Sequence, residues 1–231
     1  MNNDDLESRD ELTVGQHSTL RDVFNAIAAG DTQTSLQLLS ESPSLITQSY
    51  VTDATGEAAS VDFFTAISHY AYAGDTALHF AAAAYADDLL RSLISMGANP
   101  RARNRRGAEP LHYACDGDPA STRWNPAAQY AVVELLIAAG ADTEAVDASG
   151  VAPLHRAVRT RCASAVQALL RNGADARRRN GNGSTPLDLA GRNTGRGGTG
   201  SALARAQQAE IVELLLSHGG SADTDMHDTD R

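Results

Sequence analysis

The stretch Thr76-Ala-Leu-His79 and its three later copies decide the fold of this chain. The copies read Glu109-Pro-Leu-His112, Ala152-Pro-Leu-His155 and Thr185-Pro-Leu-Asp188, and an alanine follows two residues after each of the four. They are separated by 33, 43 and 33 residues. A signature that recurs at such a period marks similar structural units. The sequence therefore predicts a stack of units, each of which buries its apolar side against its neighbours.

A second signature follows each copy, and it consists of an apolar pair and then a glycine-containing turn. The four instances are Leu93-Ile94 before Gly97-Ala-Asn99, Leu135-Leu136 before Gly140-Ala-Asp142, Leu169-Leu170 before Gly173-Ala-Asp175, and Leu214-Leu215 before Gly219-Gly-Ser221. The pair belongs to the apolar stripe of a second helix, and the glycine stands where the chain leaves that helix with positive φ. Proline after the first signature residue favours the first turn of a short preceding helix.

With these two linked signatures the chain resembles an ankyrin-repeat protein, strongly over residues 71–220 and weakly over 20–45. The resemblance implies an all-α solenoid of helix-turn-helix units with projecting turns or hairpins. It implies four full repeats and a degenerate N-terminal cap. We expect a single domain over residues 13–220, with units at about 20–45, 71–103, 104–146, 147–179 and 180–220.

Three stretches interrupt the repeat pattern, and two flank it. Residues 46–70 form an irregular connection to which the sequence assigns no structure. The insertions 116–129 and 191–208 fall between the first and second helix of their units, so we expect them at the edge away from the projecting turns. Residues 1–12 and 221–231 are acidic, a composition typical of disordered tails.

Composition limits the chemistry. The 19 cationic side chains are all arginine, which excludes a lysine base, a Schiff base and a phosphate-loop lysine. The formal net charge is −10, although residues 75–220 carry 14 acids against 16 arginines. No apolar run reaches the roughly 18 residues that span a membrane, and the acidic N-terminus lacks the pattern of a secretion signal, so we expect a cytoplasmic protein. Cys115 and Cys162 lack Cys-x-x-Cys spacing, which favours reduced, buried fillers.

Metal and catalytic sites are not expected. His79, His112 and His155 occupy one position in successive repeats, and packed helices lie about 8–10 Å apart, too far for a shared ion bound at about 2 Å. Each ring is expected to bond neighbouring backbone instead. Gly195–Gly200 matches a dinucleotide-binding pattern, but a repeat helix precedes it where that pattern needs a strand. We predict no catalytic residues, no cofactor, no metal and no enzyme activity.

Arginines crowd two of the projecting turns, at Arg101, Arg103, Arg105 and Arg106 and again at 177–179. They are either solvated charges paired with acidic neighbours or a docking site for an acidic protein. Nucleic acid is less favoured, because the sequence pI is near 5.0. Trp124 either packs over the edge of the stack or anchors a partner.

The resemblance implies a non-catalytic protein–protein interaction module, an adaptor, inhibitor or regulatory subunit, which binds a protein on its concave surface and is monomeric. The predicted partner-binding residues are Tyr72, Asp75, Arg103, Arg105, Arg106, Asp116, Ser149, Arg159, Thr160, Arg179, Asn182 and Arg192. The alternatives are anion or nucleic-acid binding through the arginine-rich turns, and an enzyme-like pocket built by the two insertions.

Overall fold

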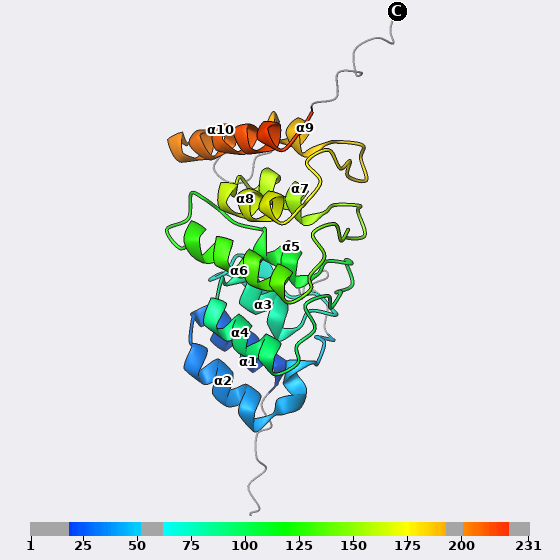
Figure 1. The fold of residues 1–231 in the computed structure, drawn as a ribbon. Helices are drawn as coiled ribbons and strands as arrows, with labels where there is room; N and C mark the ends of the chain where they lie inside the picture. Colours follow the sequence, from blue (N-terminus) through cyan, green and yellow to red (C-terminus); the bar gives the residue numbers. More distant parts are fainter. Residues whose placement is uncertain (1–18, 52–61, 193–200, 222–231) are drawn as a thin grey trace, which may run out of the picture.

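The structure is a computed structural model that describes residues 19–51, 62–192 and 201–221. In these ranges the α-helices form pairs that stack in chain order, from α1 and α2 at one end to α9 and α10 at the other (Figure 1). The helices are α1 (Leu20–Ala29), α2 (Thr32–Glu41), α3 (Ala77–Ala83), α4 (Asp87–Ser95), α5 (Pro110–Ala114), α6 (Pro126–Ala138), α7 (Pro153–Arg159), α8 (Ala163–Arg171), α9 (Pro186–Ala190) and α10 (Ala202–Ser217). A 3-10 helix, η1 (Pro43–Ile46), and two strands, β1 (Phe63–Phe64) and β2 (His69–Tyr70), complete the described elements. The predicted all-α solenoid is confirmed.

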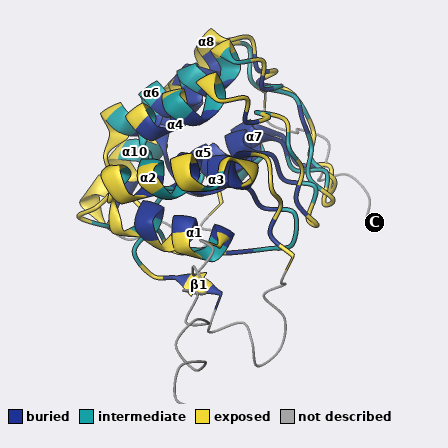
Figure 2. Ribbon diagram, turned by 90° about the horizontal axis from the view of Figure 1, so that it is seen from below, coloured by how far each residue is buried: buried dark blue, intermediate teal, exposed yellow. Residues whose placement is uncertain are grey.

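The first helix of each pair lies in an inner layer and the second in an outer layer (Figure 2). Inner helices carry small side chains such as Ala81 and Ala114, both fully buried, so neighbouring units approach closely. Outer helices supply larger buried side chains, among them Leu90 and Leu136. Each fully buried leucine contributes about 1.5–3 kcal/mol by leaving water. The core therefore runs along the whole stack, as expected of a repeat protein.

The pair α1 and α2 occupies the segment that was predicted as a degenerate first unit. Thr19 caps α1 by accepting from the backbone N–H of Asp22, and Gly30 ends the helix with a φ of 78°. Phe24 on the buried face of α1 stacks on Phe80 of α3, with ring centroids 3.7 Å apart. This unit lacks the histidine signature, yet it packs on the next unit through aromatic rings.

The three signature histidines bond backbone through both ring nitrogens, and His79 and His112 thereby link their own unit to the next. Nδ1 of His79 accepts from the Thr76 N–H at 3.1 Å, and Nε2 donates to the carbonyl of Ala108 at 3.2 Å. His112 makes the same two bonds, to the Glu109 N–H at 3.1 Å and the Val151 carbonyl at 3.1 Å. An imidazole that accepts at Nδ1 and donates at Nε2 is neutral. Burial lowers the pKa of His112 from 6.5 to about 4, consistent with that state.

The projecting turns, hereafter fingers, are β-turns at residues 104–107, 147–150 and 180–183. Each begins with Asn104, Asp147 or Asn180, whose side-chain oxygen accepts from the N–H groups two and four residues later. Each ends in a glycine with positive φ. Neighbouring fingers are linked through their backbones, since Ala148 N–H donates to the carbonyl of Arg106 at 2.8 Å. The fingers therefore form one connected edge of the stack, on the right of Figure 1.

The boundaries of the predicted insertions need correction. Helix α6 begins at Pro126, because Asn125 caps its first N–H groups, and α10 begins at Ala202 behind a Ser201 cap. Residues 126–129 and 202–208 are thus helical. Their alanines are too small to form the stripe of large apolar residues by which the sequence indicates a second helix. The loop before α6 lies opposite the fingers, as predicted (Figure 1). The matched pattern at 195–200, the segment 1–12 and the tail from 222 lie outside the described residues.

Candidate partner-binding surface

A short hairpin in the connection 46–70 lies against the inner helices, where the sequence predicted no structure. Strands β1 and β2 pair antiparallel, with Phe63 opposite Tyr70 and Phe64 opposite His69. Phe64 is buried, and its ring meets that of Phe80 edge-on at 4.8 Å. At the start of the hairpin, the buried Asp62 accepts from the Arg21 guanidinium at 2.7 Å and from the Tyr50 hydroxyl at 2.8 Å. The apolar contact and the ion pair hold the hairpin on the first units.

A row of three aromatic rings, which we call the aromatic strip, begins on the outer side of the hairpin with the exposed Phe63 and Tyr70 and ends with the half-buried Tyr72. Phe63 is 37% exposed and Tyr70 38%, and their ring centroids lie 4.7 Å apart. Tyr70 and Tyr72 follow at 6.3 Å. The guanidinium of Arg106, from the 104–107 finger, lies 5.1 Å from the centre of the Tyr72 ring and donates to its hydroxyl at 3.0 Å. The strip thus joins the hairpin to a finger.

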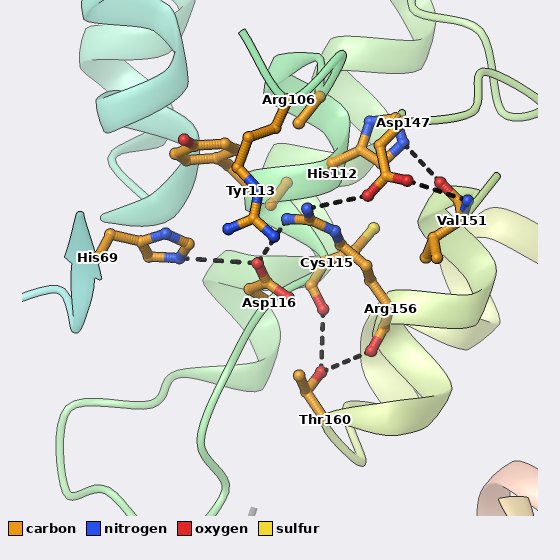
Figure 3. Close-up of polar contacts among 12 residues, drawn as sticks. His69, Arg106, His112, Tyr113, Cys115, Asp116, Asp147, Val151, Arg156 and Thr160 are labelled. Carbon is orange, nitrogen blue, oxygen red and sulfur yellow. Dashed lines mark hydrogen bonds and ion pairs between the residues drawn. The ribbon is translucent and has the colours of Figure 1, made fainter. Parts of the chain in front are cut away.

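A buried charge network lies beside the hairpin, between α5 and α7 (Figure 3). Arg156 of α7 donates to Asp116 at 2.8 Å and to Asp147, the first residue of a finger, at 3.3 Å. Nε2 of His69 on β2 lies 4.0 Å from the same Asp116 oxygen. Burial alone would raise the pKa of Asp116, but Arg156, with smaller contributions from His69 and Arg159, holds it below its ordinary value. The network therefore connects the hairpin, the segment just after α5, the inner helix α7 and a finger.

The arginines just before the fingers bond largely to the neighbouring unit. Arg101 pairs with Asp142 at 3.0 Å, and Arg178 pairs with Glu144 at 2.9 Å. Arg103 is exposed and donates to the carbonyls of Val146 and Gly107. The predicted pairing with acidic neighbours is thus confirmed for Arg101 and Arg178. Arg105 and Arg106, at the tip of the 104–107 finger, are exposed.

Most of the predicted partner-binding residues are accessible. Those that are exposed or half-buried are Tyr72, Arg103, Arg105, Arg106, Asp116, Ser149, Arg159, Arg179, Asn182 and Arg192. Asp75 and Thr160 are instead buried, which corrects their predicted contact role. Asp75 accepts from the Tyr113 hydroxyl at 2.9 Å and from Asn104 at 2.8 Å. The Thr160 hydroxyl bonds backbone carbonyls at the ends of α5 and α7.

Trp124 packs in the loop before α6. It is half-buried, and its indole N–H donates to Gln129 at 2.9 Å. Gln129 is fully buried and in turn donates to the carbonyl of Ala114 at 3.0 Å. In the same loop Arg123 reaches the hairpin and donates to the carbonyl of Ala66 at 3.0 Å. Two adjacent residues thus tie this loop to the hairpin, through Arg123, and to α6, through Trp124.

Sequence reasoning missed two parts of this surface. Phe63 and Tyr70 lie in the segment without repeat signal, and only their pairing across a hairpin brings them together. The network around Arg156 was missed because it joins two separate units and the hairpin. The finger residues Asn104, Asp147 and Asn180 did leave a signal, since each stands eight positions before the last residue of its signature and three before a glycine.

Two further features of the described residues concern metal-binding clusters and thiols. In ranges 19–51, 62–192 and 201–221, no cluster of three or more histidine, cysteine or acidic side chains is arranged to hold a metal ion. Cys115 and Cys162 are buried and unbridged, and burial raises the pKa of both thiols. A thiol that stays protonated is a poor nucleophile. Among the same residues no helix is long and apolar enough to cross a bilayer.

Comparison with known protein families agrees with this architecture. A family model described as ankyrin repeats in three copies matches residues 125–228, and a model of a single ankyrin repeat matches residues 73–105. The unmatched stretch between them contains the loop before α6. No curated protein matches the chain in sequence.

Proposed function

Because the chain belongs to the ankyrin-repeat family, whose repeats are in general protein–protein interaction modules, we propose that it binds a protein partner on its fingers and inner helices. In this proposal the chain is not an enzyme; it works as an adaptor, inhibitor or regulatory subunit. The two buried free thiols suit a reducing compartment such as the cytoplasm. The chain acts there as a monomer.

Preorganisation supports the proposal. The fingers are joined to each other through their backbones. His79 and His112 bond the residue directly after the following finger, Ala108 or Val151, and His155 bonds the carbonyl of Arg178. A partner that meets these fingers orders few flexible segments, and binding loses little free energy to conformational entropy. The same stiffness keeps side chains from several units in fixed positions along one surface.

The choice of an acidic partner rests on the exposed arginines at the tip of the 104–107 finger. Arg105 and Arg106 project there, with Arg103 exposed beside them. Arginine and tyrosine are enriched among residues that dominate binding energy. Just before the 147–150 finger, Asp142 and Glu144 form ion pairs with Arg101 and Arg178. An acidic protein surface therefore complements the finger at 104–107 best.

Affinity capture from a lysate of the source cell, with chemical crosslinking, tests the proposal. The bait is the full chain, compared with the triple variant Arg103→Ala, Arg105→Ala and Arg106→Ala. The matched control is Arg91→Ala, which removes an exposed arginine from the outer helix α4. We expect a protein captured by the wild type and the control to be lost with the triple variant. Equal capture by all three baits would contradict binding at the fingers, and capture of nucleic acid instead would favour the alternative.

A further inference from the structure

We propose that the aromatic strip and the neighbouring tip of the 104–107 finger form the principal binding site of this module. The site takes a short acidic segment of a partner protein that carries an aromatic or aliphatic side chain. This inference rests on the proposed function, and it places the strongest contacts on a hairpin outside the repeats. The fingers at 147–150 and 180–183 then contribute less binding energy.

The exposure of the strip follows from the hairpin itself. Successive side chains of a strand point to opposite faces. Phe64 on β1 is buried against Phe24 and Phe80, so its neighbour Phe63 points away from the stack. Tyr70 is paired with Phe63 and points the same way. The same contacts that fix the hairpin thus leave both residues partly exposed, and a partner that covers them buries their remaining apolar surface.

The rings are held in place before any partner binds. Phe63, Tyr70 and Tyr72 contact each other in sequence, and Arg106 lies over the last ring. Tyrosine and phenylalanine have two side-chain torsions each, so fixing them on binding costs little entropy. Contiguous exposed apolar groups with polar neighbours are typical of protein interaction sites. The strip has this character, while its hydroxyl groups keep it compatible with water.

The charge of the surroundings selects the partner. Arg105 and Arg106 are exposed at one end of the strip. The two acids nearest to it along the chain, Asp62 and Asp75, are buried and bonded within the fold. These two acids therefore lie inside the fold, whereas Arg105 and Arg106 are exposed on its surface. A carboxylate that meets the Arg105–Arg106 tip while a ring or aliphatic chain covers Tyr70 satisfies both parts of the site.

A displayed library of random 12-residue peptides, selected on the full chain, tests the inference. We expect enriched peptides that combine aspartate or glutamate with aromatic or aliphatic residues. Selected peptides are then synthesised, and their affinities are measured by fluorescence anisotropy. We expect Tyr70→Ala and Arg106→Ala each to weaken binding about tenfold or more. Because one contact is ionic, the affinity should also fall as salt is raised.

Matched controls remove equivalent side chains elsewhere. Arg91→Ala deletes an exposed arginine on α4, and Leu216→Ala deletes an apolar side chain on α10 that is more exposed than Tyr70. Both controls should bind as the wild type does, and equal thermal melting of all variants checks their folding. Peptides without acidic residues, unchanged affinity in the strip variants, or no enriched peptide would each overturn the inference. Peptide affinity lost instead with Arg179→Ala would overturn it while leaving finger binding, and the proposed function, intact.

Discussion

Replacing Arg156 by methionine should destabilise the protein strongly. The arginine side chain is 10% exposed and bonds two carboxylates, Asp116 at 2.8 Å and Asp147 at 3.3 Å, which are themselves largely buried. Methionine fills a similar volume without charge, and both carboxylates lose their shared cation. Removing one partner of a buried ion pair typically costs about 3–5 kcal/mol, since the remaining charge is left without compensation. A typical domain has only about 5–15 kcal/mol of stability in total.

Urea unfolding followed by circular dichroism measures this loss. With a slope of about 2 kcal/mol per molar urea, the midpoint should fall by about 2 M. The matched control is Arg178→Met, which breaks an ion pair to Glu144 in which the arginine side chain is 36% exposed. Exposed pairs contribute about 0–1 kcal/mol, so this variant should unfold near the wild-type midpoint.

Neutralising the acids provides the internal check. In the triple variant Arg156→Met, Asp116→Asn and Asp147→Asn no buried charge is left unpaired, so part of the lost stability should return. A loss below 1 kcal/mol for Arg156→Met, or no recovery in the triple variant, would refute the claim that the paired charges hold these units together.

Three further predictions follow from single features of the fold. Burial lowers the pKa of His112 from 6.5 to about 4, so the unfolded chain takes up this proton first as the pH falls. The contribution of His112 to stability should be constant well above pH 6.5 and fall by about 3 kcal/mol toward pH 4, and His79 and His155, whose pKa burial also lowers, should add to the loss. Urea midpoints across this range should show the decrease, with a shallower slope in His112→Gln. A Cβ at Gly181 would overlap the carbonyl oxygen of Ser149, so Gly181→Ala should displace the 180–183 finger and lower the free energy of unfolding by about 1–3 kcal/mol, measured by thermal melting. In the control Gly191→Ala the added Cβ has no atom closer than 3.8 Å, so this variant should melt near the wild type. Phe64→Ala should cost about 3–4 kcal/mol and raise hydrogen exchange in residues 62–70, because the ring anchors the hairpin on Phe80; unchanged exchange there would contradict that role.

The repeat units were predictable because they are locally consistent. At fixed positions in a unit, histidine bonds backbone, proline begins a helix and glycine ends a helix with positive φ. Because each role requires a particular residue type, that residue recurs in the sequence. Gly97, Gly140 and Gly173 have positive φ as predicted, and the three signature histidines bond backbone as predicted. A pattern of this kind is readable because every copy repeats the same constraint.

The hairpin and the charge network could not be predicted, because their contacts do not recur from one repeat to the next. Arg156 bonds Asp116 across 40 residues and Asp147 across 9, and no repeat carries an equivalent trio. Residues 62–70 obey a two-residue alternation too short to be distinguished from irregular chain. The burial of Asp75 was missed likewise, since it depends on Tyr113 from the following unit. Contacts between non-equivalent positions leave no periodic trace.

The departures from the repeat pattern are therefore where this chain differs from a generic stack. In the unit of α9, Asp188 replaces the histidine: its carboxylate accepts from the Thr185 N–H at 2.8 Å, as Nδ1 does elsewhere, but a carboxylate has no N–H to donate to a following finger. The replacement keeps the bond within the unit and gives up the bond to the next. At the other end, the pair α1 and α2 has no such signature and is joined to the stack by Phe24 and Phe80. The hairpin packs on these same two rings. The surface that we assign to the partner therefore lies where aromatic packing replaces the contacts of the repeat signature.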